Sequence, residues 1–108
     1  KCLQCQSFLR PDAVLFTEGL PGAAWDAADT AIRKMNEGDV MLVVGTSGAV
    51  QPAASLASRR SPAYKRIEIN PDPSALTSAM DMHIAAPSGE ALPLIVARYK
   101  ELLLSERE

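Results

Sequence analysis

The stretch "DVMLVVGTSGAVQPAA", residues 39–54, decides the fold. Its first part, "VMLVVG" at residues 40–45, is a short, valine-rich apolar run without alternation that ends at glycine. This pattern predicts a strand buried on both faces, as in a parallel sheet. Pro52 suits the first turn of a helix over about residues 52–60. The turn "GTSG" between them is either an ordinary connection or a ligand site, because glycine backbone and hydroxyls at a strand's carboxyl end suit phosphate or ribose oxygens.

Helix and strand patterns alternate on both sides of this stretch. The expected elements are an extended segment or strand at 13–16, a helix over 23–36, the strand at 40–45, the helix over about 52–60, a strand at 66–70, a short helix from an Asp72 N-cap and Pro73 to about 79, a strand at 82–87 and an amphipathic helix from Ser88. This order predicts an α/β fold with a parallel sheet and right-handed crossovers. Ligands of such sheets bind just outside the carboxyl ends of the strands.

The composition bounds the size and the partners of the chain. With 108 residues it is one domain at most, or part of one, and 47% hydrophobic residues suffice for a core that is poor in aromatics. A net charge of −2 with mixed signs argues against a nucleic-acid partner. The apolar runs are too short for a membrane span and no signal-peptide pattern is present, so we expect a cytoplasmic protein without a membrane partner.

Cys2 and Cys5 form one Cys-x-x-Cys pair in "KCLQC". A disulfide would close only a small loop, and a thioredoxin-type redox pair would follow a strand inside a βαβ unit. A structural zinc site needs four ligands, of which this pair supplies two. The residues alone leave an incidental pair and half a zinc site equally open.

Asn70 strengthens the ligand interpretation of the "GTSG" turn. It ends the strand "RIEIN" about 25 residues after Gly45, near the place where nucleotide-binding units put a polar residue on the ribose. The alternative is that Asn70-Pro71 only starts a turn. The turn matches neither a P-loop nor Gly-x-Gly-x-x-Gly, so the signal favours a nucleotide without naming it.

Candidates for catalysis are poor. Glu18 fits a surface carboxylate better than a cleft residue, and His83 has no neighbouring pattern that would orient it as a base. Ser47 lacks the Gly-x-Ser-x-Gly context of a nucleophile elbow. On its residues alone, the chain is expected to be a nucleotide-binding piece without its reactive group.

Several motifs follow one another as they do in a known family: "CLQC", "LRPDAVLFTE", "VMLVVGTSGAVQPAA", "IEIN" and "APSGEALP". In this order and spacing they resemble the C-terminal part of a sirtuin, an NAD⁺-dependent protein-lysine deacylase of the Sir2 family, most closely the bacterial and sirtuin-5-like class. The resemblance implies a partial Rossmann-like sheet. It assigns residues 1–10 to the remnant of a zinc-binding small domain and residues 11–108 to the C-terminal part of the NAD-binding domain.

The resemblance also implies residue roles. The cofactor-binding set for NAD would be Gly45, Thr46, Ser47, Asn70, Pro71, Asp72 and Ser88. Cys2 and Cys5 would be the second pair of a four-cysteine structural zinc site. Residues Val14, Leu15, Phe16, Thr17 and Glu18 would form an extended strand that pairs with the backbone of an acyl-lysine peptide.

The sequence departs from the family pattern at two of these positions. Thr17 stands where the family usually has glycine, which puts normal substrate binding in doubt, and Asp72 replaces a glutamate. The family's glycine-rich NAD loop, first cysteine pair and catalytic histidine have no counterpart here, and His83 does not match that histidine. We therefore expect no catalytic residue in this chain, inactivity in isolation, and an N-terminal half or partner chain that covers the exposed sheet.

Two other interpretations stay open at this point. One is a non-catalytic nucleotide-binding module related to the middle domain of thiamine-diphosphate enzymes, which would have no reason to carry "KCLQC". The other is a regulatory fragment that pairs with an N-terminal partner chain.

Overall fold

The computed structural model describes residues 1–59 and 63–106. Its elements are α1 (Gly22–Arg33), β1 (Val40–Val44), α2 (Ala53–Ser58), β2 (Lys65–Ile69), the 3₁₀ turn η1 (Thr77–Ala79), β3 (Met82–Ile84) and α3 (Ser88–Ser105). The strands form a parallel sheet in the order β1-β2-β3. The predicted α/β class and the alternation of helices and strands are therefore confirmed. The last residue of the predicted 52–60 helix lies outside the described residues.

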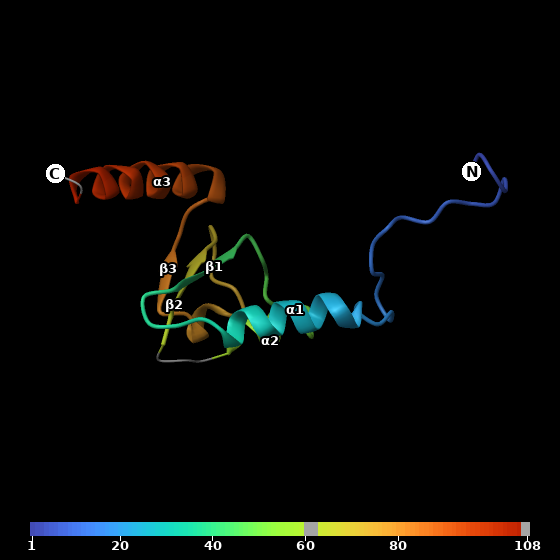
Figure 1. Ribbon diagram of the computed structural model, residues 1–108, viewed down its shortest axis with the longest axis horizontal. Helices are drawn as coiled ribbons and strands as arrows, with labels where there is room; N and C mark the ends of the chain where they lie inside the picture. The colour runs from blue at the N-terminus through green and yellow to red at the C-terminus, as the bar shows by residue number, and fades with distance from the viewer. Residues whose placement is uncertain (60–62, 107–108) are drawn as a thin grey trace.

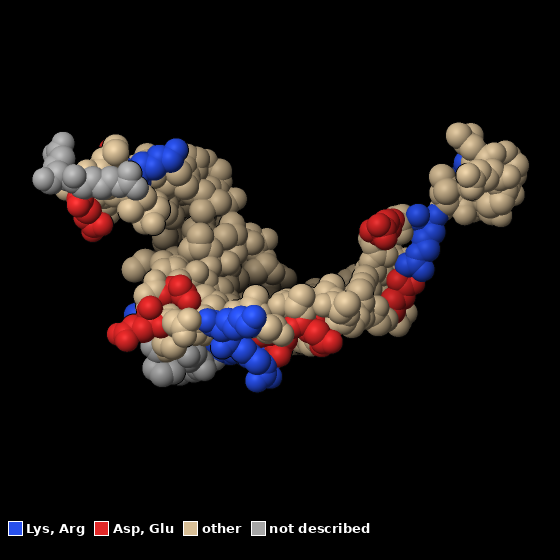
Figure 2. Space-filling model, viewed as in Figure 1, with Lys and Arg blue, Asp and Glu red and all other residues tan. Residues whose placement is uncertain are grey.

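The elements form a small sheet with helices beside it and an arm that leads away (Figure 1). Residues 1–21 make up this arm, which contributes to an overall length of 62 Å against a width of 29 Å. The helix α3 begins shortly after β3 ends, at the edge where the strands have their carboxyl ends. In Figure 2 the molecule is hollowed between the arm and α3, and acidic and basic side chains are interleaved on the visible face. No helix among the described residues is long and apolar enough to cross a membrane.

The buried cluster that includes β1 lies on one face of the sheet. Val43 of β1 packs with Ala54 of α2 and with Leu76, and Met41 joins this cluster from the same strand face. The alternate residues Leu42 and Val44 are 47% and 37% exposed. The prediction that residues 40–45 are buried on both faces is thus wrong for the chain as described. On the second face, Ile69 of β2 is fully buried, but the edge strand β1 lies uncovered beside it.

The predicted helix from Pro73 to residue 79 is also wrong. Only η1 is helical there, and its N-cap is Leu76 instead of Asp72. Side chains compete for the backbone in this segment: Ser74 N–H donates to Thr77 Oγ1 at 2.8 Å, and Leu76 N–H donates to Ser74 Oγ at 3.1 Å. Such local bonds replace the helical ladder.

Two further boundaries differ from the expected ones. The strand predicted at 82–87 is only β3, and residues 13–16 form no strand but lead into a turn. The amphipathic stripe expected on α3 is present in the sequence, but most of it is exposed, with Tyr99 at 61% and Leu102 at 46%.

At the amino end of β2, a buried guanidinium is matched by one carboxylate. Arg66 is 4% exposed, and its Nε lies 3.5 Å from Asp81 Oδ2. The same oxygen accepts the Arg66 N–H at 2.8 Å, while Asp81 N–H donates to Arg66 O at 2.9 Å. The Arg66 N–H bond, followed by the guanidinium charge, lowers the pKa of Asp81 below its ordinary value. This pair fixes the start of β3 against β2.

Asp81→Asn should lower the melting temperature at pH 7, because the amide still accepts the backbone N–H but leaves the Arg66 charge unmatched. A carboxyl whose folded pKa is depressed stabilises above its unfolded pKa, about 3.9 for aspartate, and loses that contribution as the pH falls through the folded value. The difference between wild type and variant should therefore shrink below about pH 4. Thermal melts across pH, with the exposed Asp12→Asn as control, measure this; a gap that persists at low pH would contradict it.

The turn after β1 depends on two glycines with left-handed backbone. Gly45 has φ +61°, and a Cβ at this position would meet only open space. Gly48 has φ +66°, and a Cβ there would lie 2.5 Å from Leu76 Cγ. Alanine at Gly45 therefore meets only the backbone penalty, whereas alanine at Gly48 meets that penalty and a collision with a core side chain.

Gly45→Ala should therefore lower the free energy of unfolding of the natural full-length protein by about 1 kcal/mol. Gly48→Ala should lower it by about 2–4 kcal/mol, the sum of the backbone and overpacking penalties. Denaturant unfolding of both variants compares them directly. Equal losses would show that the contact between Gly48 and Leu76 does not constrain the turn.

Candidate functional site

The carboxyl ends of β1 and β2 bring two predicted segments together. Gly45 N–H donates to Ile69 O at 3.0 Å, which continues the sheet by one residue into the turn. The Asn70 side-chain amide then donates from Nδ2 to Thr46 O at 2.8 Å. The turn after β1 and the residue after β2, which are 24 positions apart in the sequence, are thus joined directly.

The turn itself is held from several sides. Thr46 Oγ1 accepts the Gly48 N–H at 3.1 Å, and Ser47 O accepts the Ala75 N–H at 3.1 Å. Ser47 is exposed. Backbone and hydroxyl groups at the carboxyl edge of a parallel sheet form the kind of concave, polar surface that receives phosphate or ribose oxygens.

The remaining residues predicted for the cofactor lie around this edge. Pro71 and Asp72 are exposed and directly follow Asn70. Ser88 is half-buried and begins α3, which starts at the same edge of the sheet. The hydrogen bonds join Thr46 to Asn70, whereas Pro71, Asp72 and Ser88 are placed near that pair by topology alone.

His83 has a structural partner at this edge. Its Nε2 lies 2.9 Å from Asn70 O, and the residue is half-buried on β3. This ring nitrogen therefore faces a backbone carbonyl.

Sequence reasoning did not single out Glu68, the most buried charged residue of the site. Its side chain on β2 is fully buried, and it accepts short hydrogen bonds from Ser74 Oγ and Thr77 Oγ1. Burial raises the pKa of this carboxyl, but hydrogen bonds from Ser74, Thr77 and the Asn70 amide outweigh burial, so its pKa lies below the ordinary value. A charged residue between the two isoleucines of the strand "RIEIN" was the available signal for such a buried site.

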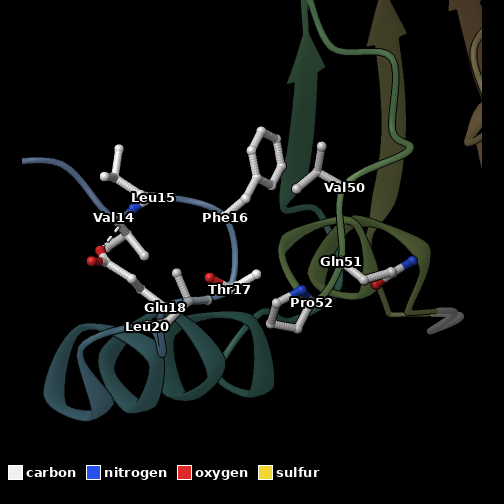
Figure 3. Close-up of a pocket in the computed structure, with 9 residues that line it drawn as sticks. All are labelled: Val14, Leu15, Phe16, Thr17, Glu18, Leu20, Val50, Gln51 and Pro52. Atoms are coloured by element: carbon white, nitrogen blue, oxygen red, sulfur yellow. Dashed lines mark hydrogen bonds between the residues drawn. The ribbon is translucent and has the colours of Figure 1, made fainter.

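The residues predicted for substrate binding line a cavity of about 340 Å³. One wall is formed by Val14, Leu15, Phe16, Thr17, Glu18 and Leu20, and the other by Val50, Gln51 and Pro52. Figure 3 shows the Phe16 ring beside the Val50 side chain, and Thr17 of the arm on the side of the cavity opposite Pro52. The arm and the connection from β1 to α2 therefore share one mostly apolar cavity.

A tight turn shapes the arm at this cavity. Glu18 N–H donates to Leu15 O at 3.1 Å, and Glu18 Oε2 accepts the Leu15 N–H at 2.9 Å and Arg10 Nη2 at 2.5 Å. The Arg10 guanidinium, together with the Leu15 N–H, lowers the pKa of Glu18. Glu18 is exposed, as expected of a surface carboxylate, and it also lines the cavity and closes this turn (Figure 3).

Thr17 occupies the strained position of that turn, with φ +75°. It is the third residue of a four-residue turn from Leu15 to Glu18, where a positive φ favours glycine. A β-branched side chain is unfavourable in this region of backbone space. The segment Val14–Glu18 is consequently a turn in this structure and not the predicted extended strand.

The two cysteines lie at the tip of the arm in a compact loop. Cys2 N–H donates to Ser7 O at 2.8 Å, and Gln6 N–H donates to Cys2 O at 2.9 Å. Both thiols are free, and hydrogen bonds from Ser7 and then from Cys2 lower the pKa of Cys5. Within residues 1–59 and 63–106, no group of three or more His, Cys, Asp or Glu side chains is placed to hold a metal.

Comparisons with known proteins find similarity to one family. A sequence model of the Sir2 family matches residues 1–52. NAD-dependent protein deacylase 2 of Pyrobaculum aerophilum is 45% identical over 103 residues, which cover 94% of this chain and 40% of that protein. The chain is therefore similar to Sir2-family deacylases over nearly its whole length.

Solved Sir2 structures extend this likeness to the fold. A Sir2 homologue mutant in complex with ADP ribose superposes with a TM-score of 0.82 at 39% identity, covering 95% of this chain and 41% of that one. A Sir2 homologue in complex with NAD gives a TM-score of 0.79 at 38% identity, over 95% and 40% of the two chains. The predicted partial Rossmann-like fold is confirmed. The chain spans about 40% of the length of the curated relatives that it matches.

Thr17→Gly should raise the free energy of unfolding by about 0.5–1 kcal/mol. Glycine removes the strain of the left-handed backbone at position 17 in the folded state. This gain in free energy exceeds the cost of the greater chain entropy that glycine gives the unfolded state. Thr30→Gly, the same substitution on the exposed side of α1, should lower stability instead. Urea unfolding of the natural full-length protein measures both, and a loss at both positions would mean that the Leu15–Glu18 turn is not strained.

Proposed function

We propose that the chain is the C-terminal part of an NAD⁺-dependent protein-lysine deacylase. The whole protein would transfer an acyl group from lysine to ADP-ribose and release nicotinamide. The hydrogen bond from Asn70 Nδ2 to Thr46 O carries this proposal, because it joins the two segments that the family resemblance assigns to NAD. The names of the relatives, NAD-dependent protein deacylases, support the same reaction.

The cofactor would lie along the carboxyl edge of the sheet. Gly45, Thr46 and Ser47 would face it with backbone and hydroxyl groups, while Asn70, Pro71 and Asp72 would meet the ribose side. Ser88, at the first residue of α3, would lie nearest the adenine. NAD⁺ supplies the ribose carbon that accepts the acyl oxygen as nicotinamide leaves. The chain's own contribution is to bind and orient this cofactor.

The acyl-lysine substrate would enter the cavity between the arm and the connection after β1. Its walls carry apolar side chains, including Phe16 and Val50, that suit the aliphatic stem of a lysine. Recognition by strand addition needs free backbone groups on the arm. In the present turn the Leu15 N–H and C=O are both engaged by Glu18. Peptide binding would therefore have to use the neighbouring groups or open this turn.

No residue of this chain is assigned as the catalytic base. His83 Nε2 faces the Asn70 carbonyl and lies on β3, away from the cavity residues. The general base and the rest of the NAD site would come from the remainder of the protein. We propose that the 108-residue chain alone is inactive.

Cys2 and Cys5 would provide two of the four thiolates of a structural zinc site, with residues 1–10 as part of a small domain and residues 11–108 as part of the NAD-binding domain. The lowered pKa of Cys5 favours the thiolate that zinc requires. We also propose that the protein is cytoplasmic and belongs to the bacterial and sirtuin-5-like subclass. We propose no nucleic-acid partner and no membrane partner for it.

The uncovered sheet face would be covered by the rest of the protein or by a partner chain. Leu42, Val44 and the edge of β1 are exposed and would otherwise invite pairing with other molecules. The thiamine-diphosphate module is not favoured, since the relatives and the similar solved structures are Sir2 proteins.

The test is steady-state kinetics of the natural full-length protein on an acyl-lysine peptide. Nicotinamide release should require both peptide and NAD⁺. Asn70→Ala should raise KM for NAD⁺ about threefold to tenfold, the range expected for one lost hydrogen bond.

Asn36→Ala is the matched control, because Asn36 lies in the loop before β1 at the opposite edge of the sheet. It should leave KM for NAD⁺ unchanged. Deacylation that proceeds without NAD⁺ would overturn the proposed reaction. Full activity of the isolated 108-residue chain would overturn the claim that its site is incomplete.

A further inference from the structure

Glu68 is a fully buried carboxylate that belongs to none of the roles assigned above. It lies in β2, two residues before Asn70 and opposite His83 in the sheet register. An unmatched charge at such a place is strongly unfavourable. Two hydroxyls solvate it, Ser74 Oγ at one oxygen and Thr77 Oγ1 at the other.

Both hydroxyls are fixed in direction. Ser74 Oγ accepts the Leu76 N–H at 3.1 Å, and Thr77 Oγ1 accepts the Ser74 N–H at 2.8 Å. Each hydroxyl has a single proton, and that proton is donated to Glu68. The carboxylate therefore organises both the side chains and the backbone of the segment from Ser74 to Thr77.

The segment from Ser74 to Thr77 contacts the candidate NAD turn, Gly45–Gly48. Ala75 N–H donates to Ser47 O at 3.1 Å, and Leu76 packs so closely under Gly48 that a Cβ there would collide with it. From the other side, Asn70 Nδ2 holds Thr46 O. Ala75 and Leu76 lie between the two residues whose hydroxyls bind Glu68. The Asn70 amide also forms a hydrogen bond with Glu68.

We propose that Glu68 is a positioning residue that holds the turn Gly45–Gly48 in its ligand-binding conformation through Ser74, Thr77 and the segment between them. The inference rests on the proposed function, since the ligand in question is NAD⁺. Glu68 itself touches no substrate or cofactor in this arrangement.

A carboxylate is needed here, not only a polar side chain of the same shape. Both hydroxyls donate, so the partner must accept at both of its positions. A glutamine presents one acceptor oxygen and one NH₂ group, and that NH₂ group would face a hydroxyl that already donates. One of the two hydroxyl protons then loses its acceptor, which weakens the hold on the segment that carries Ala75 and Leu76.

The experiment measures binding of NAD⁺ and of ADP-ribose to the natural full-length protein by calorimetry. Glu68→Gln should weaken both ligands about tenfold, in the range observed for residues that act through a packed network. Ser74→Ala combined with Thr77→Val should weaken them equally. Adding Glu68→Gln to this double variant should cause a smaller loss than it does in the wild type, because the contacts through Ser74 and Thr77 are already gone.

Tyr64→Phe is the matched control for a merely structural effect. Tyr64 is buried and its hydroxyl donates to Arg59 O at 3.1 Å, near the amino end of the same strand. This variant loses one buried hydrogen bond far from the turn and should leave both dissociation constants unchanged. Equal weakening by Tyr64→Phe and Glu68→Gln would overturn the inference, and so would additive losses in the combined variant.

The two proposals fail in different ways. If the wild-type protein binds neither NAD⁺ nor ADP-ribose, the proposed function is wrong. If the wild type binds both and Glu68→Gln binds them equally well, the proposed function stands and the role of Glu68 is wrong.

Discussion

The parallel register between β1 and β2 is the constraint on which the rest of the site depends. Val44 lies opposite Ile69, so the next residues, Gly45 and Asn70, emerge side by side at one edge of the sheet. In an antiparallel pairing these two ends would lie at opposite edges. With this register in place, a single side-chain amide is long enough to reach Thr46 O. The ligand edge is thus a consequence of strand direction before it is a property of any particular side chain.

The same edge is stabilised by two kinds of hydrogen bond, those of the sheet backbone and those of side chains. Backbone bonds from Gly45 to Ile69 and from Asn70 to Ile84 extend the sheet and follow from the strands themselves. The bonds around Glu68 are made by side chains from a segment that the sheet does not fix. A buried carboxylate is unfavourable unless its hydrogen bonds are complete, so it specifies the path of that segment more strictly than an apolar residue would. This separates the scaffold of the site from the groups that orient it.

Local patterns in the sequence were sufficient for most elements. The apolar run ending at Gly45, the Pro52 start of α2 and the alternation around them predicted the sheet and its edge correctly. The failures arise where tertiary contacts override local preference. Asp72-Pro73 reads as a helix start, but the hydroxyls of Ser74 and Thr77 are used by Glu68 and the helix does not form. The charge of Glu68 within a strand pattern was visible in the sequence, but its partners could not be predicted, because they come from a later segment whose path depends on the folded sheet.

In the arm, side-chain contacts hold a backbone conformation that is locally unfavourable. A left-handed backbone at Thr17 is unfavourable locally, yet the turn is closed by Glu18, which binds both the Leu15 N–H and the Arg10 guanidinium. The position of strain coincides with the wall of the cavity proposed for the acyl-lysine substrate. Strained residues persist only where surrounding contacts determine them, and they cluster at ligand sites. Because the clasp between Arg10 and Glu18 is largely exposed, its contribution is screened by solvent. The turn is therefore the part of the site that a bound peptide can reshape at the least cost in free energy, whereas the edge built on Glu68 and Asn70 is fixed by buried contacts.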